Sequence, residues 1–457
     1  MPASFASLPV LAPFDAADIE TDVAEPPPHW SEVLGEAPRV CRDPWLRELL
    51  APHDEHTFVT EFLGRKPLHA PCLPGRRAHR HILTLEGLLD GIAAHRIPVD
   101  AISFLSGDGA GPPDRFQEEN FLVPERRRPA FDFTRIRDYL ARRRGSLVAF
   151  GLEHSFPSVW HFMAGVGEVT GSLVGANAYY TPSGSRVFSP HWDTHDVLIV
   201  QLHGSKRWRV YETLLAHPLQ GRPHMESNRY RGFADDLGFE ELTLHEGDLL
   251  YLPAGTPHAA WCEDDESLHL TGSILPPRWH DVLIDMTRLA LLECEKELEL
   301  RRPCPAWFLG SDDARVVAAR AAAMDRFVDL FREVALSRVL DRYFATQLPS
   351  PAGRALAPSD LALDTPLVRP PIVAFVRGGD DLVELVFLDR RIPFAAGAGP
   401  ALRWMLERRT LRAAELPGLD DETRIAVARR LVDDGFLQLG SGAGPEVDAL
   451  SPQGKTR

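Results

Sequence analysis

Histidine and aspartate gather at residues 189–197, which read SPHWDTHDV and lead into the apolar run DVLIVQL (196–202). His191 and Asp193 are the pair of interest, because proteins hold divalent metals with imidazole and carboxylate groups. If the segment enters the run as a strand, residues two apart project to the same face. The spacing therefore predicts two ligands side by side. Short His/Asp motifs are often solvated surface, so the pair needs a third ligand.

Two other histidine groups fit a metal less well. HDEH (53–56) lies between helical segments, with no apolar strand attached. His79 and His81 lie among four arginines, whose positive charge disfavours a cation: Arg65, Arg76, Arg77 and Arg80.

A candidate third ligand follows in GDLLYLPAGTPHAAW (247–261). LLYL predicts a strand, Pro253 and Gly255 predict a tight turn, and His258 then begins the returning strand with its side chain inward. A histidine at such a point can also be a core residue with a satisfied hydrogen bond. The upstream pair on the same β scaffold favours the metal interpretation.

The elements that must position these residues are β-rich. Short apolar runs alternate with turn residues between about 147 and 276, a spacing typical of an all-β sandwich or barrel. A turn is expected at HGS (203–205). Helical patterns come before this region, at 83–97 with Thr84 as N-cap, and after it, at 281–300 and 314–344.

The spacing from Gly247 to His258 is similar to the second cupin motif, although Cys262 stands where that motif usually has Asn. With His191 and Asp193, the region resembles the JmjC oxygenases and, more closely, the cupin-type ribosomal oxygenases, which hydroxylate ribosomal proteins. The segments on either side of the β region resemble this family only in outline. The resemblance implies a mixed fold with a β-dominated core, a double-stranded β-helix (cupin/JmjC) with flanking helices, a helical dimerisation region and a C-terminal winged helix.

The pattern of helical and β-rich segments, together with the resemblance, gives the expected domain organisation. It comprises an extended N-terminal segment (1–35), a JmjC/cupin catalytic domain with N-terminal helices (36–276), a helical dimerisation region (277–347), a linker (348–366), a winged-helix-like domain (367–440) and a disordered tail (441–457).

The three candidate ligands, His191, Asp193 and His258, would leave three coordination positions open, as in non-heme Fe(II) oxygenases. A closed structural zinc site would need four protein ligands. An open site can take a chelating co-substrate and then O₂. These residues are therefore predicted to bind Fe(II), and the resemblance adds 2-oxoglutarate as co-substrate.

A cation for the distal carboxylate of 2-oxoglutarate is offered by KRWRVY (206–211). On a strand, Lys206 shares one face with Trp208 and Val210, so its face is expected inside. A buried lysine is costly unless a carboxylate pairs with it. The alternative is that Arg207 and Arg209 point inward, since alternation fixes the faces but not which is inside.

The resemblance places further residues in the pocket. They are Asn177 and Tyr179 in GANAYYTPSG, and the hydroxyl positions Ser273 and Thr271 on the strand after His258. The alternative for each of them is that it is an ordinary strand residue without a role in the pocket.

The remaining histidines of this region carry weaker expectations. His195 continues the face of the ligand pair and is expected to support it or to lie near the substrate. His203 is interpreted as a turn residue, and His245 and His269 as structural.

Charge and composition narrow the partners and the compartment. The net charge is −15, which disfavours a nucleic-acid-binding surface over the whole chain and suits a cationic partner. The 5 cysteines form no C-x-x-C pair, as expected in a reducing cytosol. We find no signal peptide and no long apolar span, so a cytoplasmic protein without membrane contact is expected.

The sequence thus favours an Fe(II)- and 2-oxoglutarate-dependent oxygenase that hydroxylates an Arg or His side chain of a basic ribosomal protein, as a homodimer. One alternative is a cupin enzyme that acts on a peptide or small molecule, with or without 2-oxoglutarate. The other is a ligand-sensing regulator that uses its winged helix. Residues 367–440 hold 11 arginines, no lysine and 11 acidic residues, a neutral balance that argues against DNA reading.

Overall fold

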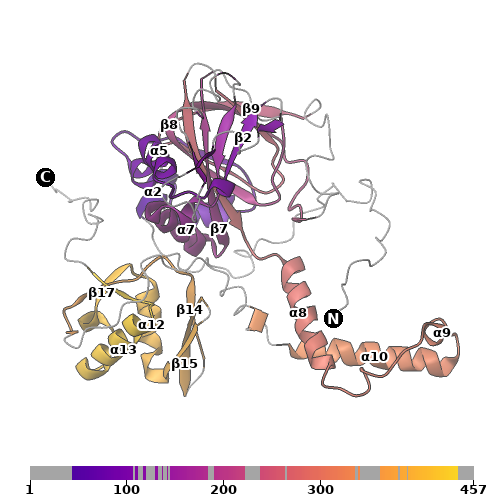
Figure 1. The fold of residues 1–457 in the computed structure, drawn as a ribbon. Helices are drawn as coiled ribbons and strands as arrows, with labels where there is room; N and C mark the ends of the chain where they lie inside the picture. The colour runs from indigo at the N-terminus through magenta and orange to yellow at the C-terminus, as the bar shows by residue number, and fades with distance from the viewer. Residues whose placement is uncertain are drawn as a thin grey trace. The chain divides into compact units, whose positions relative to one another are not determined.

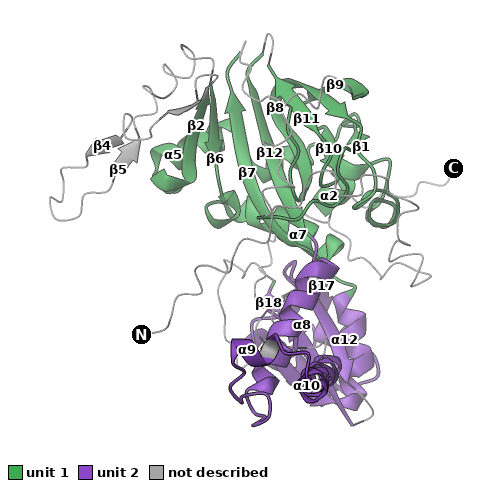
Figure 2. Cartoon of the chain, turned by 90° about the vertical axis from the view of Figure 1, so that its right-hand side faces the viewer, with its two compact units in different colours: residues 1–275, 407–409, 440–457 green, residues 276–406, 410–439 purple. Residues whose placement is uncertain are grey.

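The computed structural model describes residues 44–106, 109–111, 117–119, 129–131, 136, 142, 145–183, 190–221, 237–262, 265–334, 338–339, 361–378, 381–388 and 390–440. The predicted N-terminal segment, most of the linker and the predicted tail lie outside these residues. The chain divides into two compact units (Figure 2). Unit 1 holds residues 1–275, 407–409 and 440–457, and unit 2 holds 276–406 and 410–439.

Helices of unit 1 gather on one side of its strands (Figure 1). They are α2 (Pro44–Leu50), α3 (Glu55–Thr57), α4 (Ala78–Ile82), α5 (Leu85–Ala93) and α7 (Pro157–Thr170), with short turns at η2 (Phe58–Phe62), η3 (Val99–Ala101) and η6 (Leu152–His154). The predicted cap of α5 is confirmed, since Thr84 Oγ1 accepts a hydrogen bond from Gly87 N at 3.0 Å. Pro157 begins α7, and Gly171, at φ 63°, ends it.

The strands of unit 1 form the β-dominated core. They are β1 (Leu68–Ala70), β2 (Ile102–Ser106), β3 (Gly109–Gly111), β4 (Gln117–Glu119), β5 (Pro129–Phe131), β6 (Ser146–Ala149), β7 (Leu173–Thr181), β8 (Asp196–Tyr211), β9 (Phe239–His245), β10 (Leu249–Leu252), β11 (His258–Trp261) and β12 (Ser267–Leu275). The main sheet has the order β1-β10-β8-β12-β7-β6-β2-β3, while β9 and β11 pair with β8, and β4 pairs with β5.

Strand β8 corrects one prediction. The expected turn at residues 203–205 is absent, because β8 runs without interruption over 16 residues. Its first half pairs with β10 and β12, and its second half with β9 and β11. Gly204, at φ 64°, lies where the partners change, and a Cβ there would approach the Glu266 carbonyl oxygen to 1.9 Å. The glycine thus lets the strand bend rather than turn back.

Two apolar clusters fill unit 1. The larger one joins the helices to the sheet, with α7 residues such as Phe162 against β8 and β12 residues such as Leu198 and Leu270. The smaller one joins residues of β8, β9, β10 and β11 and includes Ile199 and Trp208 of β8. The second cluster surrounds the candidate site.

Unit 2 contains the helices predicted after the β region and a separate α/β segment. The elements are α8 (Trp279–Cys294), α9 (Ala306–Leu309), α10 (Ala314–Glu333), β13 (Pro366–Val368), β14 (Ala374–Gly378), β15 (Leu382–Phe387), β16 (Arg390–Ala395), η10 (Ala396–Ala398), α12 (Gly399–Leu406), β17 (Thr410–Arg412), η11 (Ala413–Glu415), α13 (Asp421–Asp433) and β18 (Gln438–Leu439). Within the helix expected over 314–344, α10 ends at Glu333, and most of residues 335–344 lie outside the described residues. No helix of the described ranges is both long and apolar enough to cross a membrane.

Candidate metal and co-substrate site

His191, Asp193 and His258 converge at one point of unit 1. Their ligand atoms all lie within 4.8 Å of one another, and among the described residues no other group of this kind occurs. His258 Nε2 lies 3.8 Å from Asp193 Oδ2, and the two histidine ring centroids are 4.5 Å apart. Two imidazoles and one carboxylate fit a divalent metal that keeps open coordination positions.

The backbone holds this group together in a way that differs from the expected strand spacing. Strand β8 begins only at Asp196, so Asp193 lies outside it. Instead His191 and His258 form an isolated bridge, with N–O distances of 3.1 and 2.7 Å. Gly255 N donates to the Asp193 carbonyl oxygen at 2.9 Å. The ligands thus meet because the turn 253–257 docks against residues 191–193.

Asp196, the second aspartate of the motif, fixes that turn. Its buried carboxylate accepts hydrogen bonds from Ala254 N at 2.8 Å and from the Tyr251 hydroxyl group. Tyr251 in turn accepts from Gly64 N at 2.7 Å. The two aspartates of SPHWDTHDV therefore have different surroundings, one at the candidate metal site and one within the fold.

Burial prepares His258 as a neutral ligand. Desolvation, reinforced by His191, lowers the pKa of His258 well below its usual 6.5. Metal binding requires an unprotonated imidazole, so no proton has to be displaced at neutral pH.

A cavity extends from the candidate ligands into the β core. Its empty volume is about 470 Å³. Polar and apolar residues line it together: Tyr179, His191, Asp193, Val197, Ile199, Lys206, Trp208, His258, Ala260, His269 and Thr271.

Lys206 faces this cavity, as expected from its strand face. It is only 2% exposed, its Nζ donates to Thr181 Oγ1 at 3.2 Å, and Nζ lies 6.0 Å from the Trp208 ring centroid. Burial lowers the pKa of Lys206 from 10.5 to about 8. Arg207 and Arg209 lie on the other face and pair with Glu241 at the surface.

The other expected pocket residues divide into two groups. Tyr179 and Thr271 line the cavity, and burial with the nearby Asp193 charge raises the pKa of Tyr179 to about 12. Asn177 and Ser273 are not among the residues that line the cavity, so their expected pocket roles stay predictions. The Asn177 side-chain oxygen accepts a hydrogen bond from Gly151 N at 3.3 Å, and the Asn177 side chain also forms a hydrogen bond with Tyr179, a lining residue.

His269 was expected to be structural, but it lines the cavity. It is 3% exposed and its ring stacks on Tyr179 with centroids 4.9 Å apart. The sequence offered one hint: His269 shares its strand face with Thr271 and Ser273, two and four residues later.

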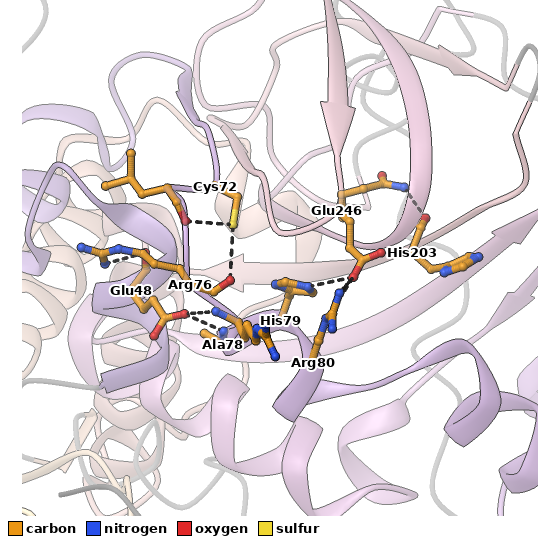
Figure 3. A network of polar contacts seen from close by, with 11 residues as sticks. Glu48, Cys72, Arg76, Ala78, His79, Arg80, His203 and Glu246 are labelled. Atoms are coloured by element: carbon orange, nitrogen blue, oxygen red, sulfur yellow. Dashed lines mark hydrogen bonds and ion pairs between the residues drawn. The ribbon is translucent and has the colours of Figure 1, made fainter. Parts of the chain in front are cut away.

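His79, from the histidine pair that fits a metal poorly, belongs to a structural network of polar contacts (Figure 3). His79 Nε2 lies 3.2 Å from Glu246, which also binds Arg80 at 2.8 Å. Next to Glu246, a Cβ on Gly247 (φ 94°) would lie 2.5 Å from Cys72 Sγ and 2.9 Å from His79 Nδ1. The first glycine of the 247–258 motif thus permits close packing against the N-terminal helices.

Known proteins match this part of the chain. Residues 152–282 match the family model described as JmjC domain. This part of the chain is a JmjC domain. The candidate ligands, Lys206 and His269 all fall within the matched JmjC residues, so the site belongs to that domain.

Relatives of the JmjC domain are named as ribosomal oxygenases or as a demethylase and hydroxylase. A Gallus gallus protein named Ribosomal oxygenase 1 is 34% identical over 184 residues, which cover 39% of this chain and 30% of that protein. A Drosophila yakuba protein named Bifunctional lysine-specific demethylase and histidyl-hydroxylase NO66 is 37% identical over 139 residues, covering 29% of this chain and 20% of that protein. The chain therefore spans less than a third of the length of these two relatives.

A solved structure extends the likeness beyond the JmjC domain. The structure of YcfD, a ribosomal oxygenase from Escherichia coli, is 16% identical, has a TM-score of 0.52, and covers 84% of this chain and 97% of that chain. At this identity the likeness shows a shared fold.

Proposed function

We propose that the protein is an Fe(II)- and 2-oxoglutarate-dependent oxygenase. The observation that carries the proposal is a cavity whose lining holds two chemically different groups. These are His191, Asp193 and His258, whose ligand atoms lie within 4.8 Å of one another, and the buried Lys206. A 2-oxo diacid has a matching pair of ends, a chelating 2-oxoacid and a distal carboxylate.

Each group has a distinct task. His191, Asp193 and His258 would hold the iron, which when bound activates O₂ so that 2-oxoglutarate yields succinate and CO₂ and one oxygen atom enters a substrate C–H bond. Lys206 would form a charge-assisted hydrogen bond with the distal carboxylate. Val197 and Ile199 supply apolar walls that keep water away from the reacting groups.

The proposed substrate is an Arg or His side chain of a basic ribosomal protein. The names of the relatives, ribosomal oxygenase and histidyl-hydroxylase, support this class. The net charge of −15 supports a cationic partner, since complementary fields speed encounter. The loops 106–116 and 212–238 are predicted to line the mouth of the pocket. Their acidic residues Glu226, Asp235 and Asp236 lie outside the described residues.

We further propose that the protein is a cytoplasmic homodimer that does not bind nucleic acid, with 367–440 as a winged-helix-like domain in a protein-contact role. The neutral balance of that segment, 11 arginines against 11 acidic residues, supports a packing role over DNA reading.

The test has two stages. Anaerobic titration should show 2-oxoglutarate binding that depends on Fe(II); without it, the oxygenase proposal is wrong and a cupin enzyme independent of 2-oxoglutarate gains support. Mass spectrometry of cellular proteins should then find a gain of one oxygen atom on a basic ribosomal protein. Raising the salt concentration should weaken peptide binding more than 2-oxoglutarate binding. If basic peptides do not raise 2-oxoglutarate turnover above the uncoupled background, the proposed ribosomal substrate is wrong. The proposed iron site would not be affected by that result.

A further inference from the structure

His269 is held rigidly in the cavity by two aromatic rings. Its imidazole lies parallel to the Tyr179 ring, at 4.9 Å and an interplanar angle of 1°. The Trp208 ring meets it edge-on at 5.4 Å and 79°. With contacts on a face and an edge, the orientation of the imidazole is fixed before any ligand enters.

This fixed ring carries unused hydrogen-bonding capacity. Among the described residues, none forms a hydrogen bond with His269 Nδ1, and the same holds for Trp208 Nε1. Buried polar atoms in proteins are usually paired, so two unpaired ones beside one cavity point to a ligand. A neutral imidazole offers one donor and one acceptor. Burial and the nearby Lys206 lower the pKa of His269 well below 6.5, which keeps the ring neutral.

Trp208 lies close to His269, to Lys206 and to a candidate metal ligand. Its ring centroid is 5.9 Å from that of His258 and 5.4 Å from that of His269. Lys206 Nζ lies over the same Trp208 ring at 6.0 Å. Lys206, His269 and the three candidate metal ligands line the same cavity. A diacid chelated at the triad, with its far end inside this cavity, would bring that end towards Lys206 and His269.

We propose that His269 binds the distal carboxylate of the diacid co-substrate beside Lys206, and so selects a 2-oxo diacid over a 2-oxo monoacid. This inference rests on the proposed function. Lys206 supplies a point charge, which attracts a carboxylate without fixing its orientation. The fixed imidazole of His269 adds a directional hydrogen bond, which the distal carboxylate of a diacid can accept and the methyl end of a monoacid cannot.

The test compares two co-substrates that differ only at the distal end. 2-Oxopentanoate has the chelating end of 2-oxoglutarate and a methyl group in place of its distal carboxylate. Dissociation constants of both acids are measured by calorimetry on the full chain loaded with Mn(II), which avoids turnover. His269→Phe keeps a ring for the stack on Tyr179 and removes both nitrogens. It should weaken 2-oxoglutarate binding by about 10–150-fold, the range for a hydrogen bond to a charged group. Binding of 2-oxopentanoate and of Mn(II) should not change.

His269→Asn is the rescue variant, since its amide group occupies the position of Nδ1, the ring nitrogen without a partner. It should recover most of the 2-oxoglutarate affinity that His269→Phe loses. If His269→Phe does not fold, His269→Leu, which has no nitrogen, should show the same selective loss.

Three results would overturn the inference. Equal weakening of both acids would mean a merely structural role, and unchanged 2-oxoglutarate binding would mean no contact. Loss of affinity in His269→Asn as large as in His269→Phe would mean that Nδ1 is not used. If the wild-type protein binds no 2-oxoglutarate, the proposed function itself is wrong.

Discussion

At the residue scale, Asp193 should be required for metal binding but not for folding. Its side chain is 33% exposed and contributes a carboxylate to the triad. We expect Asp193→Ala to abolish iron-dependent succinate production while the unfolding free energy stays close to that of the wild type. Succinate production at the wild-type rate would contradict the assignment of the triad.

Asp196 provides the matched control within the same motif. Its buried carboxylate accepts from Ala254 N and from Tyr251. Asp196→Ala leaves these donors unpaired and should lower the unfolding free energy by about 1–3 kcal/mol per lost partner. Denaturant unfolding of both variants separates the two roles.

Lys206 and Arg207 test which face of β8 acts on the co-substrate. Lys206→Ala should weaken 2-oxoglutarate binding by about 10–150-fold, because a charge-assisted hydrogen bond is lost, with little change in metal affinity. Arg207→Ala should have no such effect, since Arg207 pairs with Glu241 at the surface. The reverse result in anaerobic titrations would mean that the binding face is the outer one.

The lowered pKa of Lys206, about 8, gives binding a pH dependence. Above pH 8 the unliganded protein loses the ammonium proton, so 2-oxoglutarate must bind together with a proton. We expect the dissociation constant to rise by about tenfold per pH unit above 8. The unliganded fold should become more stable between pH 8 and 10.5, because there the unfolded chain still binds the proton.

Calorimetry in buffers with different ionisation enthalpies measures the proton uptake. Lys206→Met should bind 2-oxoglutarate weakly and without this dependence. A wild-type affinity that stays constant up to pH 10 would show that the Lys206 charge does not contribute.

At the element scale, the turn before β11 should depend on Gly255. Its φ is 83°, and a Cβ would lie 1.7 Å from the Leu215 carbonyl oxygen. Gly255→Ala should lower the unfolding free energy by more than about 3 kcal/mol and weaken metal binding, because the turn that carries His258 must move.

Gly75 is the control for backbone strain alone. Its φ is 86°, but nothing lies within 4 Å of an added Cβ. Gly75→Ala should cost only about 1–2 kcal/mol and leave metal affinity unchanged. Equal effects of the two substitutions in denaturant unfolding and metal titration would show that the contact with Leu215 is unimportant.

At the scale of the whole molecule, the helices of unit 2 should assemble with a second copy. Ala290 is the one buried residue of α8, and Leu330 that of α10, among the described residues. Large apolar side chains are exposed instead: Trp279, Leu283, Leu291, Leu292, Met324 and Val328. Two helices that expose this many large apolar side chains fit an interaction surface, so we expect a homodimer at micromolar concentration in sedimentation experiments.

A double substitution at the exposed leucines tests this expectation. Leu291→Glu with Leu292→Glu should give a monomer that still binds Fe(II) and 2-oxoglutarate. Leu382→Glu is the control, because Leu382 on β15 is 50% exposed. This variant should sediment with the mass of the dimer. A monomeric wild type would contradict the dimer.

The sequence by itself determined the chemistry of the triad. The fixed spacing of Gly247, Pro253, Gly255 and His258 requires a strand, a tight turn and a returning strand, and the turn residues allow little else. The alternation in KRWRVY likewise put Lys206 with Trp208, and the larger apolar side chains favoured that face as the inner one. Local backbone geometry and hydrophobicity decide such features, so they can be recognised without a fold.

Only the tertiary structure decided which residues line the cavity. A period of two tells which residues share a face, but it does not tell how deep each lies or what stands opposite. His269 and Thr271 reach the cavity whereas Ser273, on the same strand face, does not, because the lining depends on which parts of β7, β8 and β12 meet. The triad itself closes through the bridge between His191 and His258, a contact between segments 67 residues apart in sequence (258 − 191) that no local pattern encodes.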